Sequence, residues 1–260
     1  MNKNLKIFET NIKKKEMKFV AQYIYGRNVI VSRLKEAKDI EEVLILDSFK
    51  DKYIMDLLVA SKVKVVRCKK NKLDSLAGNS FHQGIVAKVH TYDYYNFDDI
   101  VGDLKEKADA LIVMLDGIED PHNFGAILRS CEAIGVDGVI VPKHGACPLN
   151  STVAKTSTGA IELVKVVEVT NLNNAIKRLK DEGFWVVGAE ANNSVDYREV
   201  DYNGKIVLVV GSEGKGISRL VIENCDYKVK LPMVGKVNSL NVSVACAILL
   251  YQVYNNRFPL

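Results

Sequence analysis

The chain has 260 residues, of which 48% are hydrophobic and 26% charged, and its formal net charge is +4. These proportions are ordinary for a soluble globular protein of one or two domains and exclude a disordered, collagenous or disulfide-stapled chain. The charge is uneven, because residues 1–90 hold 19 Lys/Arg and 10 Asp/Glu, whereas residues 91–260 hold 17 and 22. A basic first third indicates a polyanion-binding module, although a solvated lysine-rich surface explains the same charge.

The cysteines, histidines and apolar segments exclude several classes of protein. The five cysteines form no CxxC pair and the four histidines no pair at helical spacing, so neither a disulfide framework nor a metal site is expected. The longest strongly apolar segment, residues 242–254, falls short of the ~18 residues that span a bilayer. The N-terminal region has no apolar stretch of signal-peptide length. We therefore expect a cytoplasmic protein with no membrane partner.

The first 107 residues contain a basic tail, a small domain and a linker. Residues 1–17 form the lysine-rich tail, and residues 18–90 form the small α/β domain. In chain order its elements are an opening segment at 19–25, a helix at 28–37, a strand at 42–46, a helix at 51–60 and strands at 63–67 and 82–89. Residues 91–107 are polar and acidic, with no strong period, and are expected to be a linker with at most a short helix.

A second α/β domain is expected over residues 108–260. The predicted strands are 110–115, 136–141, 163–167, 185–189, 206–210 and 226–231, and the main helices are 124–134, 152–158, 172–182 and 241–254. Strands this apolar, alternating with helices, predict a largely parallel sheet covered on both faces. Ligands of such sheets bind at the carboxyl ends of the strands, so three loops that follow strands are the candidate ligand-binding segments.

The first loop is DGIEDPHNFGAILR, residues 116–129. Asn123 is a suitable N-cap for the following helix. Gly125 and Arg129 lie on one helical face, so the glycine leaves room for a ligand whose phosphate the arginine grips. Alternatively, Arg129 is a surface residue that pairs with Glu132, three positions later on the helix.

The second loop is GSEGKG, residues 211–216, directly after the apolar run IVLVV. Three glycines in six residues imply close backbone approach or positive φ. The Walker A pattern fails because Ile217 stands where lysine is required, and the GxGxxG pattern fails as well. A ligand-binding loop and a plain strand-to-helix turn both remain open.

The third loop is LPMVGKVNSLN, residues 231–241, which leads into the last helix. Ser239 and Asn241 lie at the start of that helix, where they either cap it or face a ligand. The helix is apolar almost all round, which indicates burial or a subunit interface.

The motifs NFGAILR, GSEGKGIS and LPMVGKVNSLNVSVA resemble the three signature motifs of the SpoU/TrmH family of RNA ribose 2′-O-methyltransferases, in the SPOUT superfamily. The resemblance covers residues 19–260. The segments YIYGRNVI and FHQGIVA are similar to the subgroup that methylates a guanosine in 23S ribosomal RNA. The resemblance implies an α/β domain with a C-terminal trefoil knot, preceded by an L30e-like RNA-binding domain. It also implies a homodimer packed through the knotted domain.

The resemblance further implies the cofactor and the site residues. S-adenosylmethionine is expected to bind in the knot, with Gly211, Leu231 and Leu240 at family cofactor positions and Met233 in the same loop. The residues expected to act at the catalytic centre are Arg129, Asn123, Glu213, Ser239 and Asn241. Arg129 is expected to grip the target phosphate and orient the 2′-hydroxyl, and Glu213 to brace its loop. No metal is expected.

The expected reaction is therefore methyl transfer from S-adenosylmethionine to a ribose 2′-hydroxyl, in a guanosine of 23S rRNA. Two alternatives stay open: a tRNA substrate, and a non-catalytic RNA-binding protein that retains the methyltransferase domain. A nucleotide-dependent enzyme with GSEGKG as its phosphate loop is disfavoured by the two failed motifs.

Overall fold

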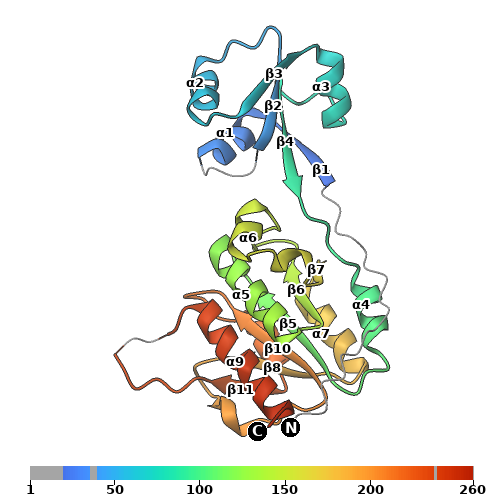
Figure 1. The fold of residues 1–260 in the computed structure, drawn as a ribbon, viewed down its shortest axis with the longest axis vertical. Coiled ribbons are helices and arrows are strands. Elements are labelled where there is room, and N and C mark those ends of the chain that lie inside the picture. The colour runs from blue at the N-terminus through green and yellow to red at the C-terminus, as the bar shows by residue number, and fades with distance from the viewer. Residues whose placement is uncertain (1–19, 36–39, 237–238, 260) are drawn as a thin grey trace, which may run out of the picture.

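The computed structural model describes residues 20–35, 40–236 and 239–259, so the expected basic tail at 1–17 lies outside the described residues. Figure 1 shows a small domain, coloured blue to teal, joined to a larger one by the segment that leaves β4 and enters α4.

The small domain is a four-stranded mixed sheet with helices on both faces. Its strands, in the order β1-β4-β2-β3, are β1 (Val20–Tyr25), β4 (Ile85–Thr91), β2 (Ile40–Leu46) and β3 (Lys64–Cys68). Ile85 and Ala87 pack with the helices α1 (Arg27–Lys35) and α2 (Lys52–Ala60), whereas Val86 packs with α3 (Lys70–Ala77). The alternation of these side chains along β4 separates the two faces of the sheet. The helix α3 was not predicted from the sequence.

The large domain contains a seven-stranded sheet in the order β7-β6-β5-β10-β8-β11-β9, and every pair of neighbouring strands is parallel. The strands are β5 (Ala110–Asp116), β6 (Gly138–Pro142), β7 (Val166–Val169), β8 (Trp185–Ala189), β9 (Val195–Asp196), β10 (Lys205–Gly211) and β11 (Tyr227–Lys230). The parallel sheet covered on both faces, as predicted, is confirmed.

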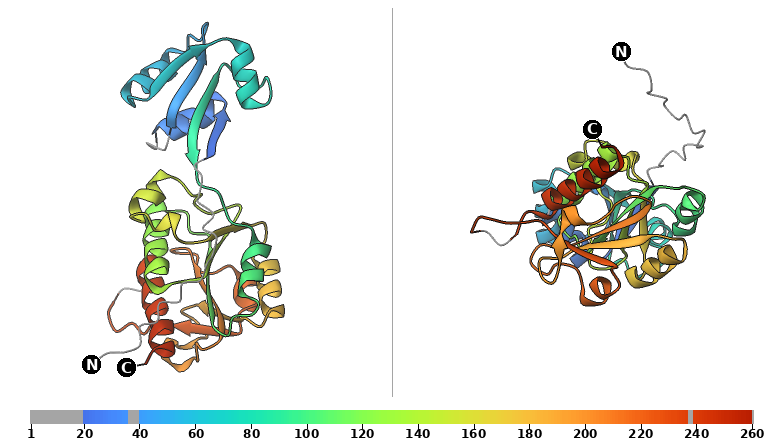
Figure 2. Two further views of the ribbon diagram at one scale, coloured as in Figure 1. Left: turned by 45° about the vertical axis from the view of Figure 1, so that its right-hand side comes forward. Right: turned by 90° about the horizontal axis from the view of Figure 1, so that it is seen from below.

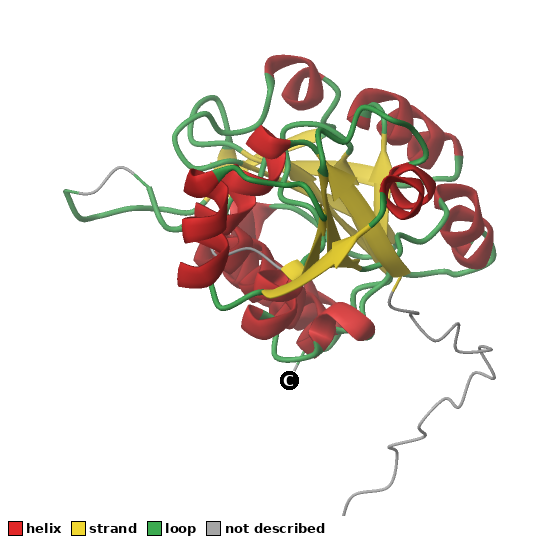
Figure 3. Cartoon of the chain, turned by 90° about the horizontal axis from the view of Figure 1, so that it is seen from above, coloured by secondary structure: helices red, strands yellow, loops and turns green. Residues whose placement is uncertain are grey.

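Helices cover both faces of this sheet, as Figures 2 and 3 show. One face is covered by α5 (Pro121–Ile134), α6 (Ser151–Thr156) and α9 (Val242–Arg257), and the other by α4 (Phe97–Leu104), α7 (Leu172–Asp181) and α8 (Arg219–Glu223). In the central strand β5, Leu111, Val113 and Leu115 pack with the first group. Ile112 and Met114 pack with the second. Because both faces of β5 are covered, its sequence reads as a continuous apolar run.

The segment expected as a linker is packed onto the large domain. The Tyr95 backbone N donates to the Val166 carbonyl at 2.8 Å, and the Tyr94 hydroxyl accepts from the Leu149 N at 3.1 Å. Tyr92 already lies in the core of the large domain, although β4 ends at Thr91. The two cores are therefore neighbours along the chain, and little backbone remains between them.

Several boundaries differ from the sequence-based expectation. The helix α5 begins at Pro121 and its N-cap is Asp120, whose carboxylate accepts from the His122 and Asn123 backbone N–H groups. Asn123 is therefore inside the helix, and its prediction as the N-cap was wrong. The strand predicted at 163–167 is β7 at Val166–Val169, because residues 160–162 form a 3₁₀ turn.

The described residues were also compared with what a membrane span and a metal site require. None of the helices among them is long and apolar enough to cross a membrane. No group of three or more His, Cys, Asp and Glu among them is arranged to hold a metal ion. The trefoil knot and the L30e-like character of the small domain stay predictions.

Candidate active site

The site lies where the connections of the large sheet change direction. β5 and β10 are adjacent, and Gly211 at the end of β10 pairs with Asp116 at the end of β5. After β5 the chain enters α5 on one face, and after β10 it enters α8 on the other face. Loops that leave neighbouring parallel strands for opposite faces open a crevice between them, the usual ligand position in such sheets.

The loop after β10 folds back tightly on Gly211. A Cβ on Gly211 would lie 2.0 Å from the carbonyl carbon of Gly216, so only glycine fits there. The turn is closed by the Gly216 N, which donates to the Ser212 carbonyl at 2.9 Å, and Gly214 has a φ of +87°. Both reasons given for this glycine-rich sequence, close backbone approach and positive φ, are therefore present.

This tight loop carries Glu213 to a point where three elements meet. Glu213 Oε1 accepts from Asn123 Nδ2 of α5 at 3.3 Å, from Asn241 Nδ2 at 2.7 Å and from the Val242 N at the start of α9 at 3.3 Å. Asn241 Nδ2 also donates to Asn123 Oδ1 at 2.8 Å. A single carboxylate oxygen of Glu213 thus joins Asn123, which lies 90 positions before it in the chain, to Val242, which lies 29 positions after it.

Of the two residues proposed to cap the last helix, Asn241 does so. Its Oδ1 accepts from the Ser243 N at 2.9 Å and from the Val244 N at 3.4 Å. Its Nδ2 remains free to donate to Glu213 and Asn123, so both roles offered for this residue are filled at once. Ser239 is exposed, and it makes no hydrogen bond with any residue whose placement is described.

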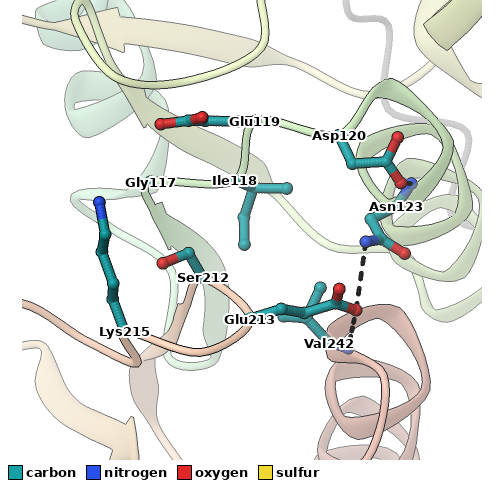
Figure 4. Close-up of a pocket in the computed structure, with 9 residues that line it drawn as sticks. All are labelled: Gly117, Ile118, Glu119, Asp120, Asn123, Ser212, Glu213, Lys215 and Val242. Carbon is teal, nitrogen blue, oxygen red and sulfur yellow. Dashed lines mark hydrogen bonds between the residues drawn. The ribbon is translucent and has the colours of Figure 1, made fainter.

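A pocket with about 500 Å³ of empty space, part of it open solvent, lies beside this junction (Figure 4). It is lined by the loops after β5 and β10 and by the start of α9: Gly117, Ile118, Glu119, Asp120, Asn123, Ser212, Glu213, Lys215 and Val242. Three carboxylates and one lysine line it, so its charge suits a cationic ligand. Glu119, Asp120 and Lys215 were not singled out from the sequence, although their position in the two strand-end loops was the available signal.

Arg129 lies on α5, six residues beyond Asn123. Its side chain is exposed and makes no hydrogen bond or ion pair with the described part of the chain, so pairing with Glu132 is not formed. Gly125, one turn earlier, does not leave room for a ligand as expected. A Cβ there would lie 1.9 Å from Thr156 Oγ1, because α5 and α6 touch at this point. The glycine therefore serves helix packing, and that expectation was wrong.

The structure does not bring all predicted cofactor residues together. Gly211 itself is not among the lining residues, but it directly precedes Ser212, which is. Leu231 is half-buried against the core of the large domain, and Met233 is 38% exposed. Neither they nor the half-buried Leu240 line the pocket, because the loop between β11 and α9 projects from the body of the domain (Figures 1 and 3).

The cysteines near the site are unsuited to nucleophilic chemistry. Cys131 of α5 and Cys246 of α9 are fully buried, and burial raises the pKa of the Cys246 thiol to about 12. Burial likewise raises the pKa of Cys131 well above its ordinary value. Both thiols therefore stay protonated near neutral pH and act as small core side chains.

The two domains match two family models. Residues 110–251 match the SpoU rRNA methylase family, and residues 23–95 match an RNA 2′-O ribose methyltransferase substrate-binding domain. The chain is 47% identical over 241 residues to a Staphylococcus epidermidis protein described as a TrmH family tRNA/rRNA methyltransferase, covering 91% of this chain and 96% of that protein.

Solved structures resemble the chain as well. The SpoU methyltransferase AviRb from Streptomyces viridochromogenes, in complex with AdoMet, has a TM-score of 0.58 at 24% identity, covering 90% of each chain. The A. aeolicus TrmH/SpoU tRNA-modifying enzyme has a TM-score of 0.54 at 34% identity, covering 62% of this chain and 84% of its own. With a family model over more than half of its length and a relative at 47% identity, the chain belongs to the SpoU/TrmH family and is an S-adenosylmethionine-dependent RNA methyltransferase.

Proposed function

We propose that the chain transfers a methyl group from S-adenosylmethionine to the ribose 2′-hydroxyl of a guanosine in 23S rRNA. The observation that carries this proposal is the arrangement along α5. Asn123 contacts Glu213 at the acidic pocket, and Arg129, exposed and unpaired within the described chain, follows on the same helix. An acidic pocket for a cationic cofactor and a free guanidinium for a phosphate are the two binding functions that this transfer needs.

The pocket suits S-adenosylmethionine in its charge. Glu119, Asp120 and Glu213 supply negative charge, which suits a ligand with a positive sulfonium and a positive amino group. When bound, the cofactor supplies an electrophilic methyl group. The Gly211 turn and the Glu213 carboxylate would hold it, and Leu231, Met233 and Leu240 stay predicted contacts.

Arg129 positions the substrate and does not remove its proton. The guanidinium group stays protonated in proteins, so it is unsuited to act as a base. Its planar fork matches a phosphate in bidentate fashion, which would fix the ribose beside the pocket and favour the charge that develops on the 2′-oxygen. Asn123 and Asn241 are proposed to hold Glu213 and the ends of α5 and α9 in register. Ser239 is proposed to contact substrate or cofactor.

The choice of RNA rests on the small domain. Its family model is one for substrate binding, and residues 1–90 carry a net charge of +9, which suits a polyanion. The subgroup resemblance of residues 23–30 and 81–87 favours 23S rRNA. The similarity to the A. aeolicus tRNA-modifying enzyme makes tRNA the second candidate.

The exposed face of α9 is proposed as the homodimer interface. Val244, Tyr251, Tyr254 and Phe258 are all exposed, and their spacing places them along one side of the helix. The rings of Tyr254 and Phe258 contact each other, with centroids 4.9 Å apart and planes tilted by 41°. Light scattering tests this proposal: the wild type should have twice the mass of Tyr251→Glu, and a wild-type monomer would contradict it.

The deciding experiment is methyl transfer from labelled S-adenosylmethionine to unmodified large-subunit rRNA and, separately, to tRNA, followed by mapping of the 2′-O-methylated nucleotide. One guanosine in rRNA supports the proposal. Label in tRNA alone would show that tRNA, and not rRNA, is the substrate. Cofactor binding without transfer to any RNA would contradict the catalytic assignment.

Arg129→Lys provides the residue-level test, because lysine keeps the charge and loses the fork. The variant should retain cofactor binding and lose most of its methyl transfer. Turnover near that of the wild type would contradict the role given to Arg129.

A further inference from the structure

The small domain has a surface cluster with an exposed aromatic ring. Phe81, in the loop between α3 and β4, is 80% exposed, whereas the Phe49 side chain near the same loop is 6% exposed. A single exposed apolar residue is ordinary by itself. Phe81 differs because the loop that presents it is fixed by hydrogen bonds on both sides.

Asn79 and His82 fix the backbone around Phe81. The Phe81 N donates to Asn79 Oδ1 at 2.8 Å, and Asn79 Nδ2 donates to the Ala77 carbonyl at 2.9 Å. The His82 ring is buried, with Nδ1 accepting from the Gly84 N and Nε2 3.0 Å from Asp74 Oδ1. Because Nδ1 accepts, the ring proton lies on Nε2 and is donated to Asp74. The ring of Phe81 is thus presented by an ordered loop.

A strained turn follows and joins this loop to α1. Gln83 and Gly84 have φ of +54° and +80°, and the Ile85 N donates to the His82 carbonyl at 3.1 Å. A non-glycine residue in this conformation is strained and persists where its surroundings hold it. The conformation of Gln83 is held by a hydrogen bond from the Arg27 backbone N, which donates to Gln83 Oε1 at 3.0 Å.

The turn also holds Arg27, whose guanidinium lies over the ring of the buried Phe49. Arg27 Nε lies 3.5 Å from the Gln83 carbonyl oxygen, Nη1 lies 3.2 Å from Asp51 Oδ2, and the guanidinium lies 5.3 Å from the centre of the Phe49 ring. Its Nη2 has no partner among the residues with described placement, and half of the side chain is exposed. Phe81 is two residues from Gln83, so their Cα atoms are at most about 7 Å apart.

The charge around the cluster favours RNA over a protein partner. Lys50 and Lys52 flank Asp51 and are exposed, and the domain belongs to the basic third of the chain. Single-stranded nucleic acids bind where aromatic rings stack on bases beside cationic side chains that contact the backbone. Phe81 offers such a ring, and Arg27 offers a pre-oriented guanidinium with an open edge.

We propose that Phe81 stacks on an unpaired base of the substrate RNA while Arg27 contacts the adjacent phosphate. The proposal rests on the proposed function, since it requires an RNA substrate. It adds the chemistry of recognition, which is a splayed, unpaired base and not a double helix.

The cluster of Phe81 and Arg27 would contact the RNA at a second position, distant from the nucleotide that is methylated. Tyr25 pairs with Val86 at one end of β4, and Thr91 ends the strand where the chain leaves for the large domain. Val86 and Thr91 are five positions apart, which corresponds to about 17 Å along the strand. The Arg27–Gln83 contact lies beyond the Tyr25–Val86 pair, so the domain contacts the RNA away from the methylated nucleotide.

The test uses the full chain and a single-stranded RNA dodecamer that contains 2-aminopurine, whose fluorescence falls when the base stacks. Phe81→Leu should bind this RNA roughly 5- to 150-fold more weakly, the range that stacking of one base supplies, and should lose the quenching. Phe81→Trp should restore both. Val59→Ala is the matched control, because Val59 is also exposed, at 74%, on α2 of the same domain.

A second measurement separates binding from catalysis. On large-subunit rRNA, Phe81→Leu should raise the KM for RNA and leave kcat unchanged, and all variants should keep the wild-type Tm because the ring is exposed. Equal affinity and equal quenching for Phe81→Leu, or equally tight binding of the annealed duplex, overturns the proposal. Absence of methyl transfer by the wild type overturns the proposed function instead, since quenching does not depend on transfer.

Discussion

The contact between α5 and α6 makes Gly125→Ala a test of how Arg129 is positioned. The new Cβ would lie 1.9 Å from Thr156 Oγ1, 2.8 Å from Thr156 Cβ and 2.9 Å from the Ser157 N. Rotation of Thr156 relieves only the contact with Oγ1, at the cost of its hydrogen bond to the Thr152 carbonyl, and it leaves Thr156 Cβ and the Ser157 N too close. The two helices must therefore move apart by roughly 0.5–1 Å to restore ordinary contact distances.

The stability cost of this change should be small. Overpacking costs about 1–3 kcal/mol, and alanine recovers about 1 kcal/mol over glycine in a helix interior. The free energy of unfolding should fall by about 0–2 kcal/mol, which lowers Tm by at most about 8 °C for a domain of this size.

The effect on activity should be much larger. Arg129 lies four residues beyond Gly125, about 6 Å along the same helix, so a shift of α5 moves its guanidinium. A misplacement of about 1 Å in a positioning group costs as much as 100-fold in rate. We expect kcat/KM for methyl transfer to fall by about that factor while the protein stays folded, as measured by transfer to rRNA beside a thermal melt.

Two further variants sharpen the experiment. Gly102→Ala in α4 has no atom within 4 Å of its new Cβ, so it should keep full activity and gain up to about 1 kcal/mol of stability. Adding Thr156→Gly to Gly125→Ala removes two of the three short contacts and should recover part of the activity. Full activity and unchanged stability in Gly125→Ala alone would refute the reasoning, because the contact would then constrain nothing.

The Gly211 turn, the cap of α9 and the buried Cys246 can each be tested by substitution. Gly211→Ala collides with backbone 2.0 Å away and should abolish cofactor binding measured by calorimetry, whereas Gly235→Ala, with open space around it, should not; equal affinities would contradict this. Asn241→Asp keeps the cap of α9 but places a carboxylate where Nδ2 donated to Glu213 at 2.7 Å, so repulsion between the two carboxylates should lower both the Tm and the activity. Asn241→Ala removes the cap and should lose about 1 kcal/mol of stability. Burial raises the pKa of Cys246 to about 12, so the folded protein keeps this proton after the unfolded chain has released it, and stability falls as pH rises from about 9 toward 12. Urea unfolding at pH 8 and pH 10 should show this fall in the free energy of unfolding, and the fall should be smaller in Cys246→Ala. An equal fall in the two proteins would contradict the role given to Cys246.

The fold was largely readable from sequence because its strands are buried on both faces. Runs such as residues 110–115 and 206–210 are apolar throughout, and that pattern predicts a central parallel strand. The helix α3 was missed because Leu73 is its one buried residue, so its apolar period is weak. The start of α5 was misplaced although Asp120 followed by Pro121 is a good start signal, an N-cap with proline in the first turn.

The site was only partly readable for a different reason. The motifs singled out Asn123, Glu213 and Asn241, but their convergence on one carboxylate oxygen depends on tertiary contacts that local sequence does not encode. Gly125 was misread in the same way, because its neighbour Thr156 lies 31 positions later and is brought close by packing alone.

The strand order of the large sheet constrains how the chain can fold during synthesis. β10 lies between β5 and β8, two strands that leave the ribosome before it. Until residue 211 has emerged, β5 and β8 each present an unpaired edge, and bare edges of apolar strands favour association with other chains. The sheet closes late, through contacts between distant parts of the sequence, which is the pattern of a slow folder. A nascent chain of this protein therefore passes through a long aggregation-prone interval that ends only when its last fifth is made.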